Sequence, residues 1–138
     1  MKRVGLISLC ALIALTISAC GGDDGGGIDT NLFGTWTKVR TVLRDCGNPN
    51  DNNSTNETCD DQVCETLMIT DQLRYTLTTL VRGQAQVENG QVQVSETQIN
   101  FLPDNSTGNT IYEYSITATA LTLSNVTVIC TEDFVYNK

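Results

Sequence analysis

Short segments in which apolar and polar residues alternate dominate the sequence from Leu32 to Lys138. In the stretch 72–82, for example, Leu73 and Tyr75 share one face of an extended chain, and arginine and threonine lie on the other. A period of two residues is typical of strands with one buried face, and no amphipathic helical stretch of useful length follows Leu32. The sequence therefore predicts an all-β domain.

We expect eight strands, or nine if one of them is split. They span 35–44, 63–70, 72–82, 84–88, 91–95, 97–102, 110–117 and 120–136, and the last folds over at Ser124-Asn125. The dipeptide Asn89-Gly90 is favoured in type I′ hairpin turns, so a turn is expected there. Closely spaced strands favour an antiparallel meander, and closure into a barrel removes its exposed edges. We therefore predict a single small antiparallel eight-stranded up-and-down barrel over 32–138.

The first twenty residues have the layout of an export signal. Lys2 and Arg3 precede an apolar run of 14 residues, Val4 to Ile17. This run is shorter than the roughly 20 residues that a membrane-spanning helix needs, and it fits the core of a secretory signal. The alternatives are a plain signal peptide, in which the next cysteine has no role, and a short buried helix.

Ile17-Ser18-Ala19-Cys20 resembles the cleavage sequence of bacterial lipoproteins. The resemblance implies that residues 1–19 are a signal peptide and that the Cys20 thiol receives diacylglycerol. The new amino terminus would then be acylated with a fatty acid such as palmitate. Several acyl chains anchor a protein stably where one does not, so the membrane is an expected partner through this anchor. Cys10 lies in the apolar run and is removed with it.

Residues 20–31 form the predicted lipidated start and flexible linker, because glycine and aspartate dominate this stretch. Gly21 stands where some bacterial lipoproteins carry an aspartate that retains them in the inner membrane. By that resemblance we expect an outer-membrane protein of the cell envelope. Asp23-Asp24 also resembles short acidic signals for surface export, so the periplasmic face and the cell surface both remain open.

Four cysteines follow the expected anchor: Cys46, Cys59, Cys64 and Cys130. An even number in an exported chain indicates two disulfides, and the rival four-cysteine metal site lacks paired C-x-x-C spacing. We expect Cys64–Cys130 to join strands and Cys46–Cys59 to close the long polar connection 45–62. The pairing Cys46–Cys130 with Cys59–Cys64 is a close competitor.

Charge and composition exclude several function classes. Without residues 1–19 the chain has six basic and 16 acidic residues, a net charge of −10, and no basic run that would suit a nucleic acid. The sequence contains no histidine, no G-x-S-x-G motif and no calcium-loop or phosphate-loop pattern. The acidic pairs Asp23-Asp24, Asp60-Asp61 and Glu132-Asp133 are interpreted as solvated charge. We therefore expect no enzyme activity, no metal and no cofactor.

Leu32-Phe33-Gly34-Thr35-Trp36 resembles the start of bacterial lipocalin-like domains, in which a Gly-x-Trp motif opens the first strand. The stretch YEYSITATALTLSN, residues 112–125, resembles the penultimate hairpin of that family, although the turn at 117–120 lacks the usual glycine. The resemblance implies a lipocalin-like barrel in which the Trp36 ring closes one end.

Binding is then the expected function. An eight-stranded barrel either fills its interior with side chains or holds one small ligand. Four aromatic residues are candidates to line such a cavity or to fill the core: Trp36, Tyr75, Tyr112 and Tyr114. We expect a lipocalin-like lipoprotein that binds a small apolar molecule. The alternatives are a protein-interaction module, although the Ser-Gly-x-x-Tyr loop of bacterial lysozyme inhibitors is absent and no protein partner is indicated, and a structural barrel without a ligand.

Overall fold

The computed structural model describes residues 27–138 of the chain. The predicted signal peptide, Cys20 and the first part of the predicted linker lie outside the described residues. The described elements are η1 (Thr30–Leu32), β1 (Gly34–Arg44), η2 (Pro49–Asp51), β2 (Asn53–Asn56), β3 (Val63–Ile69), β4 (Arg74–Val81), β5 (Gln84–Val94), β6 (Gln98–Pro103), β7 (Thr110–Ile116), β8 (Ala120–Val126) and β9 (Thr131–Asn137). The η elements are single 3₁₀ turns.

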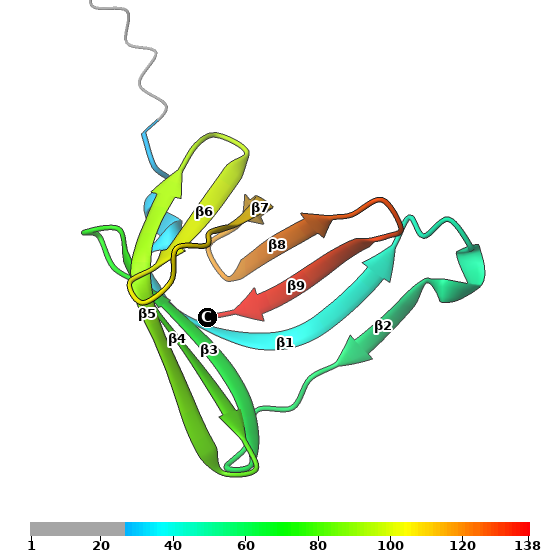
Figure 1. The fold of residues 1–138 in the computed structure, drawn as a ribbon, viewed down its shortest axis with the longest axis horizontal. Helices are drawn as coiled ribbons and strands as arrows, with labels where there is room; N and C mark the ends of the chain where they lie inside the picture. Colours follow the sequence, from blue (N-terminus) through cyan, green and yellow to red (C-terminus); the bar gives the residue numbers. More distant parts are fainter. Residues whose placement is uncertain (1–26) are drawn as a thin grey trace, which may run out of the picture.

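Eight antiparallel strands form one closed barrel, which confirms the predicted fold class (Figure 1). Strands β3 to β8 each pair with the next strand along the chain, and β1 closes the sheet by pairing with both β3 and β9. Closure leaves none of these eight strands with a fully free edge, which removes the hazard of edge-to-edge association.

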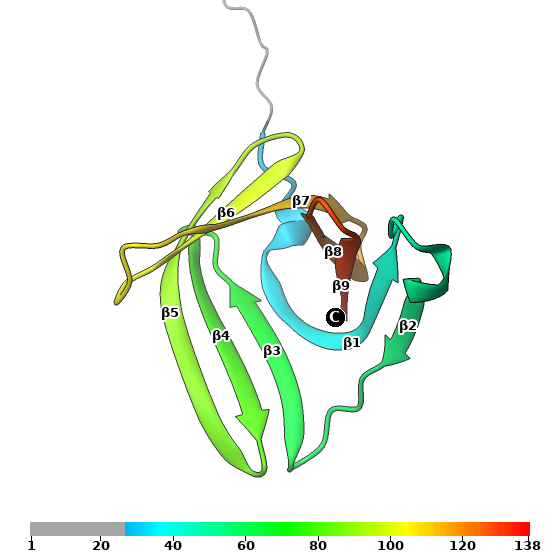
Figure 2. The ribbon, with the colours of Figure 1, turned by 45° about the vertical axis from the view of Figure 1, so that its right-hand side comes forward.

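Two different strands pair with successive parts of the same edge of β1. Residues 34–37 pair with β3, whereas residues 40–43 pair with β2, and β9 runs along the other edge. The register against β9 shifts between Lys38 and Arg40, and Figure 2 shows how strongly the strand curves. Because β3 leaves β1 at this shift, the barrel is more open at the far end of β1 than at its start.

Strand β2 lies inside the connection 45–62, for which the sequence predicts no strand. Its four residues are polar and exposed, so no alternation marks them. They pair through the backbone with the part of β1 that β3 leaves uncovered. This strand therefore forms because its backbone pairs with β1, and its side-chain pattern gives no indication of it.

The expected hairpin turn at Asn89-Gly90 is wrong, because both residues lie within the continuous strand β5. The predicted strands 84–88 and 91–95 are therefore one strand. The turn that precedes it lies at Arg82-Gly83, between the predicted strands 72–82 and 84–88, and both its residues have positive φ, as a type I′ turn requires. Gly90 has a different role. A Cβ atom there would lie 2.3 Å from the Leu102 carbonyl oxygen and 2.3 Å from the Tyr75 ring, so glycine lets that ring pack on the backbone.

The last predicted strand is split into β8 and β9, and the expected fold-over at Ser124-Asn125 is wrong. The turn lies at residues 127–130, where the Thr127 hydroxyl accepts a hydrogen bond from the Cys130 amide at 3.1 Å. Ser124 instead stays in β8 opposite Asp133, and its hydroxyl donates to that carboxylate at 2.7 Å. A polar residue on the outer face of a strand thus gives the same local signal as a turn residue.

The closed end of the barrel is packed around Trp36. Its ring is fully buried with Leu32, and its Nε1 donates a hydrogen bond to the Leu32 carbonyl oxygen at 2.9 Å. The chain before β1 also belongs to this end, because Asp29 caps η1 and Ile28 packs against the core. The Lys138 ammonium also contacts this end, 4.6 Å from the centre of the Trp36 ring.

Candidate functional site

A cavity of about 80 Å³ lies inside the barrel. Its lining brings together side chains from every strand from β3 to β9. The polar and aromatic members are Tyr75, Glu88, Phe101, Thr110, Tyr112 and Tyr136, and leucines complete the wall. Two of the four aromatic residues predicted from the sequence, Tyr75 and Tyr112, are therefore at the cavity.

Aromatic rings fill much of the interior in one row. Tyr75 and Phe101 have ring centres 5.0 Å apart, Phe101 and Tyr112 5.9 Å, and Tyr112 and Phe134 6.0 Å, all edge to face. This is a preferred geometry for aromatic pairs. The row leaves a cavity well below the roughly 300–1,000 Å³ of a typical drug-sized site. The space suits a very small molecule or the end group of a longer one.

Two tyrosine hydroxyls at the cavity each orient one carboxylate, that of Glu88, which is exposed at the cavity rim, and that of Glu65, which is partly buried. Tyr75 donates to Glu88 Oε1 at 2.6 Å, and Tyr136 donates to Glu65 Oε1 at 2.5 Å. Burial, followed by the neighbouring glutamate, raises the pKa of both phenols. Both hydroxyls therefore remain protonated donors at neutral pH and hold the glutamates as acceptors.

A partly buried charge cluster lies where β3 separates from β1. The Lys38 ammonium is 3.7 Å from Glu65 Oε2 and 3.6 Å from Glu57 Oε1, and the lysine side chain is only 14% exposed. Glu57 is held in turn by the Thr41 hydroxyl at 2.8 Å. A second cavity of about 140 Å³ opens beside these groups, with Lys38, Glu57 and Glu65 in its wall.

Four residues of this region are not predicted from the sequence as site residues: Glu65, Glu88, Tyr136 and Lys38. Alternation could have identified Glu65 as an inward-facing residue, because it lies two residues before the buried Leu67 in the same strand. The same argument places Glu88 on the face of Val92, but the expected turn at 89–90 would have broken that strand. Lys38 follows Trp36 by two residues, and an inward-facing lysine contradicts the usual preference for exposure.

The other two predicted aromatic residues lie away from the cavity. Trp36 packs at the closed end, as described above. Tyr114 is half-buried near the β5–β6 turn, where its hydroxyl donates to the Ser95 carbonyl oxygen at 3.1 Å. A hollow of about 330 Å³ lies beside Tyr114 and Ile28. It is larger than the interior cavity, but it does not bring together a comparable set of oriented charged groups, so the interior cavity is the better candidate site.

The two disulfides have the competing pairing, Cys46–Cys130 and Cys59–Cys64, so the expected Cys64–Cys130 and Cys46–Cys59 bridges are wrong. The reason is that β1 lies between β3, which carries Cys64, and β9, which follows Cys130. Two strand spacings of about 4.8 Å exceed the Cα separation that a disulfide tolerates.

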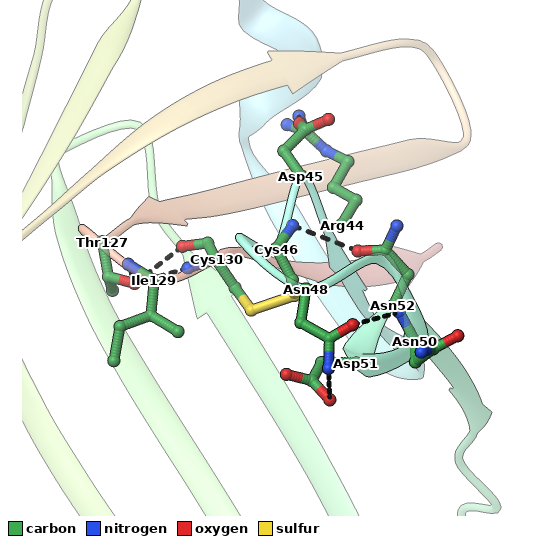
Figure 3. Close-up of a disulfide and its surroundings, with 10 residues drawn as sticks. All are labelled: Arg44, Asp45, Cys46, Asn48, Asn50, Asp51, Asn52, Thr127, Ile129 and Cys130. Carbon is green, nitrogen blue, oxygen red and sulfur yellow. Dashed lines mark hydrogen bonds and ion pairs between the residues drawn. A yellow bond between two sulfur atoms is a disulfide. The ribbon is translucent and has the colours of Figure 1, made fainter.

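Cys46 instead follows the end of β1 directly beside the start of β9, with its Cα atom 4.1 Å from that of Cys130 (Figure 3). The Asn52 side-chain oxygen accepts a hydrogen bond from the Cys46 amide at 3.1 Å, which ties the 48–52 turn to the same point. The bridge therefore joins the two strands that close the barrel and also the start of the long connection.

Acidic pairs noted in the sequence have structural roles outside the cavity. Asp60 accepts hydrogen bonds from the backbone amides of Val63 and Gln62, which lower the pKa of its carboxyl group. Burial works to raise the pKa of Asp133, but hydrogen bonds from Arg44 and Ser124 outweigh it and the pKa is lowered. Glu132, the partner of Asp133 in sequence, is on the opposite, inner face of β9, so the interpretation of this pair as solvated charge is incomplete.

Between residues 27 and 138, no three histidine, cysteine, aspartate or glutamate side chains lie close enough together to hold a metal ion. In the same range, no helix has the length and apolar character needed to cross a membrane.

Comparison with known structures identifies the fold. A lipocalin-like protein from Bacteroides uniformis superposes with a TM-score of 0.57 at 13% identity, over 78% of this chain and 98% of its own. An uncharacterized protein from Bacteroides eggerthii superposes with a TM-score of 0.54 at 12% identity, over 77% and 98%. The chain is therefore a lipocalin-like β-barrel. No protein-family model and no curated protein matches the sequence.

Proposed function

We propose that this chain is a lipid-anchored lipocalin-like protein of the bacterial cell envelope that binds one small molecule inside its barrel, without catalysis. The observation that supports this proposal best is the interior cavity, whose wall is aromatic and aliphatic and whose exposed rim carries the Glu88 carboxylate, oriented by the Tyr75 hydroxyl. Small-molecule sites usually have a mostly apolar wall and a small number of polar groups that point into the cavity. The absence of histidine from the whole sequence supports binding over general acid–base chemistry.

The size of the cavity limits the ligand. About 80 Å³ accommodates a short alkyl or similarly small group, and a longer molecule would extend toward the more open end near Lys38. We therefore propose a ligand with a short apolar part, held by contact with Phe101 and Tyr112 and oriented by polar groups.

Mass spectrometry of the full chain, purified in neutral detergent from cells that export it, tests this function. We expect one small species of defined mass to be released on denaturation. Leu77→Phe, which adds volume to the cavity wall, should abolish the species because the space is taken. Val87→Phe is the matched control on the exposed side of the sheet and should retain it. A wild-type sample without any released species would contradict the proposal.

The proposed anchor is tested by Cys20→Ala. We expect this variant to lose metabolic labelling with palmitate and to leave the membrane fraction, because the thiol is the proposed acyl acceptor. Cys10→Ala is the control, since that residue lies in the segment that we expect to be removed. Retention of label by Cys20→Ala would refute lipidation there. Fractionation of inner and outer membranes tests the outer-membrane location that Gly21 supports.

A protein-interaction module is the second candidate function, and one surface feature favours it. The β8–β9 turn exposes Val126, Val128 and Ile129 by 60%, 103% and 68%, next to the Cys46–Cys130 bridge. Exposed apolar residues that lie together, here on a turn held by a disulfide, are typical of contact surfaces. A denatured sample without released small molecule would shift the assignment toward this function.

A further inference from the structure

The interior of the barrel carries more negative than positive charge. Glu65 lies on the inner face of β3 with Leu67, and Glu88 lies on the inner face of β5 with Val92. Glu132 stands on the same side of β9 as Phe134, which packs against the core. Three strands therefore each place one carboxylate on the inner face of the sheet, and of these three Glu88 lines the cavity itself, at its exposed rim.

Among the described residues, Lys38 is the basic residue that forms ion pairs in this region, and its charge is already paired. Its ammonium contacts both Glu57 and Glu65. Glu88 and Glu132 take part in no salt bridge within residues 27–138. Glu88 is held by the Tyr75 hydroxyl alone, which leaves its second oxygen able to accept from a ligand.

The aromatic rings of the same interior suit a cation. An ammonium near an aromatic face is attracted by the negative potential of the ring. The structure contains one such pair here, since Lys38 Nζ lies 5.0 Å from the centre of the Phe134 ring. Phe134 is followed in the aromatic row by Tyr112 and Phe101, both of which line the cavity.

The electrostatic environment of Tyr112 agrees with this arrangement. Burial is the largest cause that raises the pKa of its phenol, and Glu65, Glu132 and Glu88 raise the pKa further through their charges. The three inward carboxylates thus act on one point of the cavity wall, although they come from three different strands.

We infer that the cavity selects a small organic cation, a primary amine or a substituted ammonium on a short apolar body, and disfavours fatty acids and other anions. The charged group would lie at the cavity rim beside Glu88 and the Tyr75 ring, and the apolar part would contact the leucine wall inside. An anion would meet uncompensated carboxylates instead. This inference rests on the proposed binding function and names the chemical class of its ligand.

Three probes of similar length separate charge from shape: n-butylamine, butan-1-ol and butyrate. We expect calorimetry on the detergent-solubilised full chain to give the tightest binding for n-butylamine, by about tenfold or more over butyrate, because charge interactions in a partly buried site are strong. Added salt should reduce this preference. Equal or tighter binding of butyrate or butanol would overturn the cation inference and leave the proposed binding function standing. Failure of all three to bind would also overturn the inference, whereas the mass-spectrometry result decides the binding function independently.

Glu88→Gln removes the charge but keeps an oxygen that accepts from Tyr75. We expect it to weaken n-butylamine binding about tenfold and to leave butan-1-ol binding nearly unchanged. Glu113→Gln is the matched control, since Glu113 is exposed on the outer face of β7, and it should change neither. Equal losses for the two variants, or none for Glu88→Gln, would overturn the role of Glu88 in selecting a cation. A melting curve for each variant separates lost binding from lost folding.

Discussion

Trp36→Ala is expected to lower the free energy of unfolding by about 3–5 kcal/mol, the usual cost of truncating a fully buried aromatic residue. The ring has no exposed surface, packs with Leu32, and donates its indole hydrogen bond to the backbone of η1. The substitution would open a cavity at the closed end and leave the Leu32 carbonyl oxygen without this donor. For a domain whose total stability is about 5–15 kcal/mol, the loss should be visible as a sharp fall in melting temperature.

Chemical denaturation of the wild type and of two variants measures this effect. Trp36→Phe keeps a ring but removes the indole donor, so its loss should be clearly smaller than that of Trp36→Ala. Indole fluorescence of the wild type gives an independent check, since a buried ring emits at short wavelength and resists acrylamide quenching. A Trp36→Ala variant within about 1 kcal/mol of the wild type would show that the ring does not support this end of the barrel.

Removal of the Cys46–Cys130 bridge should produce the second large effect. The bridge spans 84 residues along the chain, whereas Cys59–Cys64 spans five. In the chain-entropy description, closing the longer loop stabilises the folded state by about 4.5 kcal/mol and closing the shorter one by about 2 kcal/mol. We expect the double variant Cys46→Ser/Cys130→Ser to be destabilised roughly twice as much as Cys59→Ser/Cys64→Ser.

Denaturation midpoints of the two double variants provide the comparison, and each serves as the control for the other. Non-reducing peptide mapping of the wild type should recover a cross-linked fragment that contains Cys46 and Cys130. A fragment that joins Cys64 to Cys130 would contradict the strand order at the closure of the barrel, because β1 separates those two residues.

Local pattern predicted most of the strands. Alternation around Tyr75 identified β4, and the run from Tyr112 to Ile116 identified β7, because inner and outer faces differ clearly in polarity there. The Gly-Thr-Trp sequence indicated the start of β1 through its resemblance to lipocalin-like domains, and Trp36 is the residue around which the closed end packs. Each of these features depends on residues close together in the chain, so a sequence contains the information directly.

Ambiguous local signals led to the errors. Asn89-Gly90 has the composition of a hairpin turn, yet Gly90 is required because the Tyr75 ring, 15 residues away in the chain, lies against its backbone. Ser124 has the composition of a loop residue, yet it faces outward and bonds to Asp133 on the neighbouring strand. In both cases a partner distant in sequence decided between two conformations that the local residues permit.

The candidate site depends most on the closed barrel. Alternation along the sequence suffices to predict short strands with one apolar face, and the four cysteines that follow Cys20 suffice to predict two disulfides. The tertiary structure determines that Cys46 pairs with Cys130, that β2 covers the edge of β1 left by β3, and that Glu65 and Glu88 meet tyrosines at the cavity. The physical reason is that alternation assigns each side chain to a face, whereas strand order and register, which arise from closure of the whole sheet, determine which side chains meet across the interior.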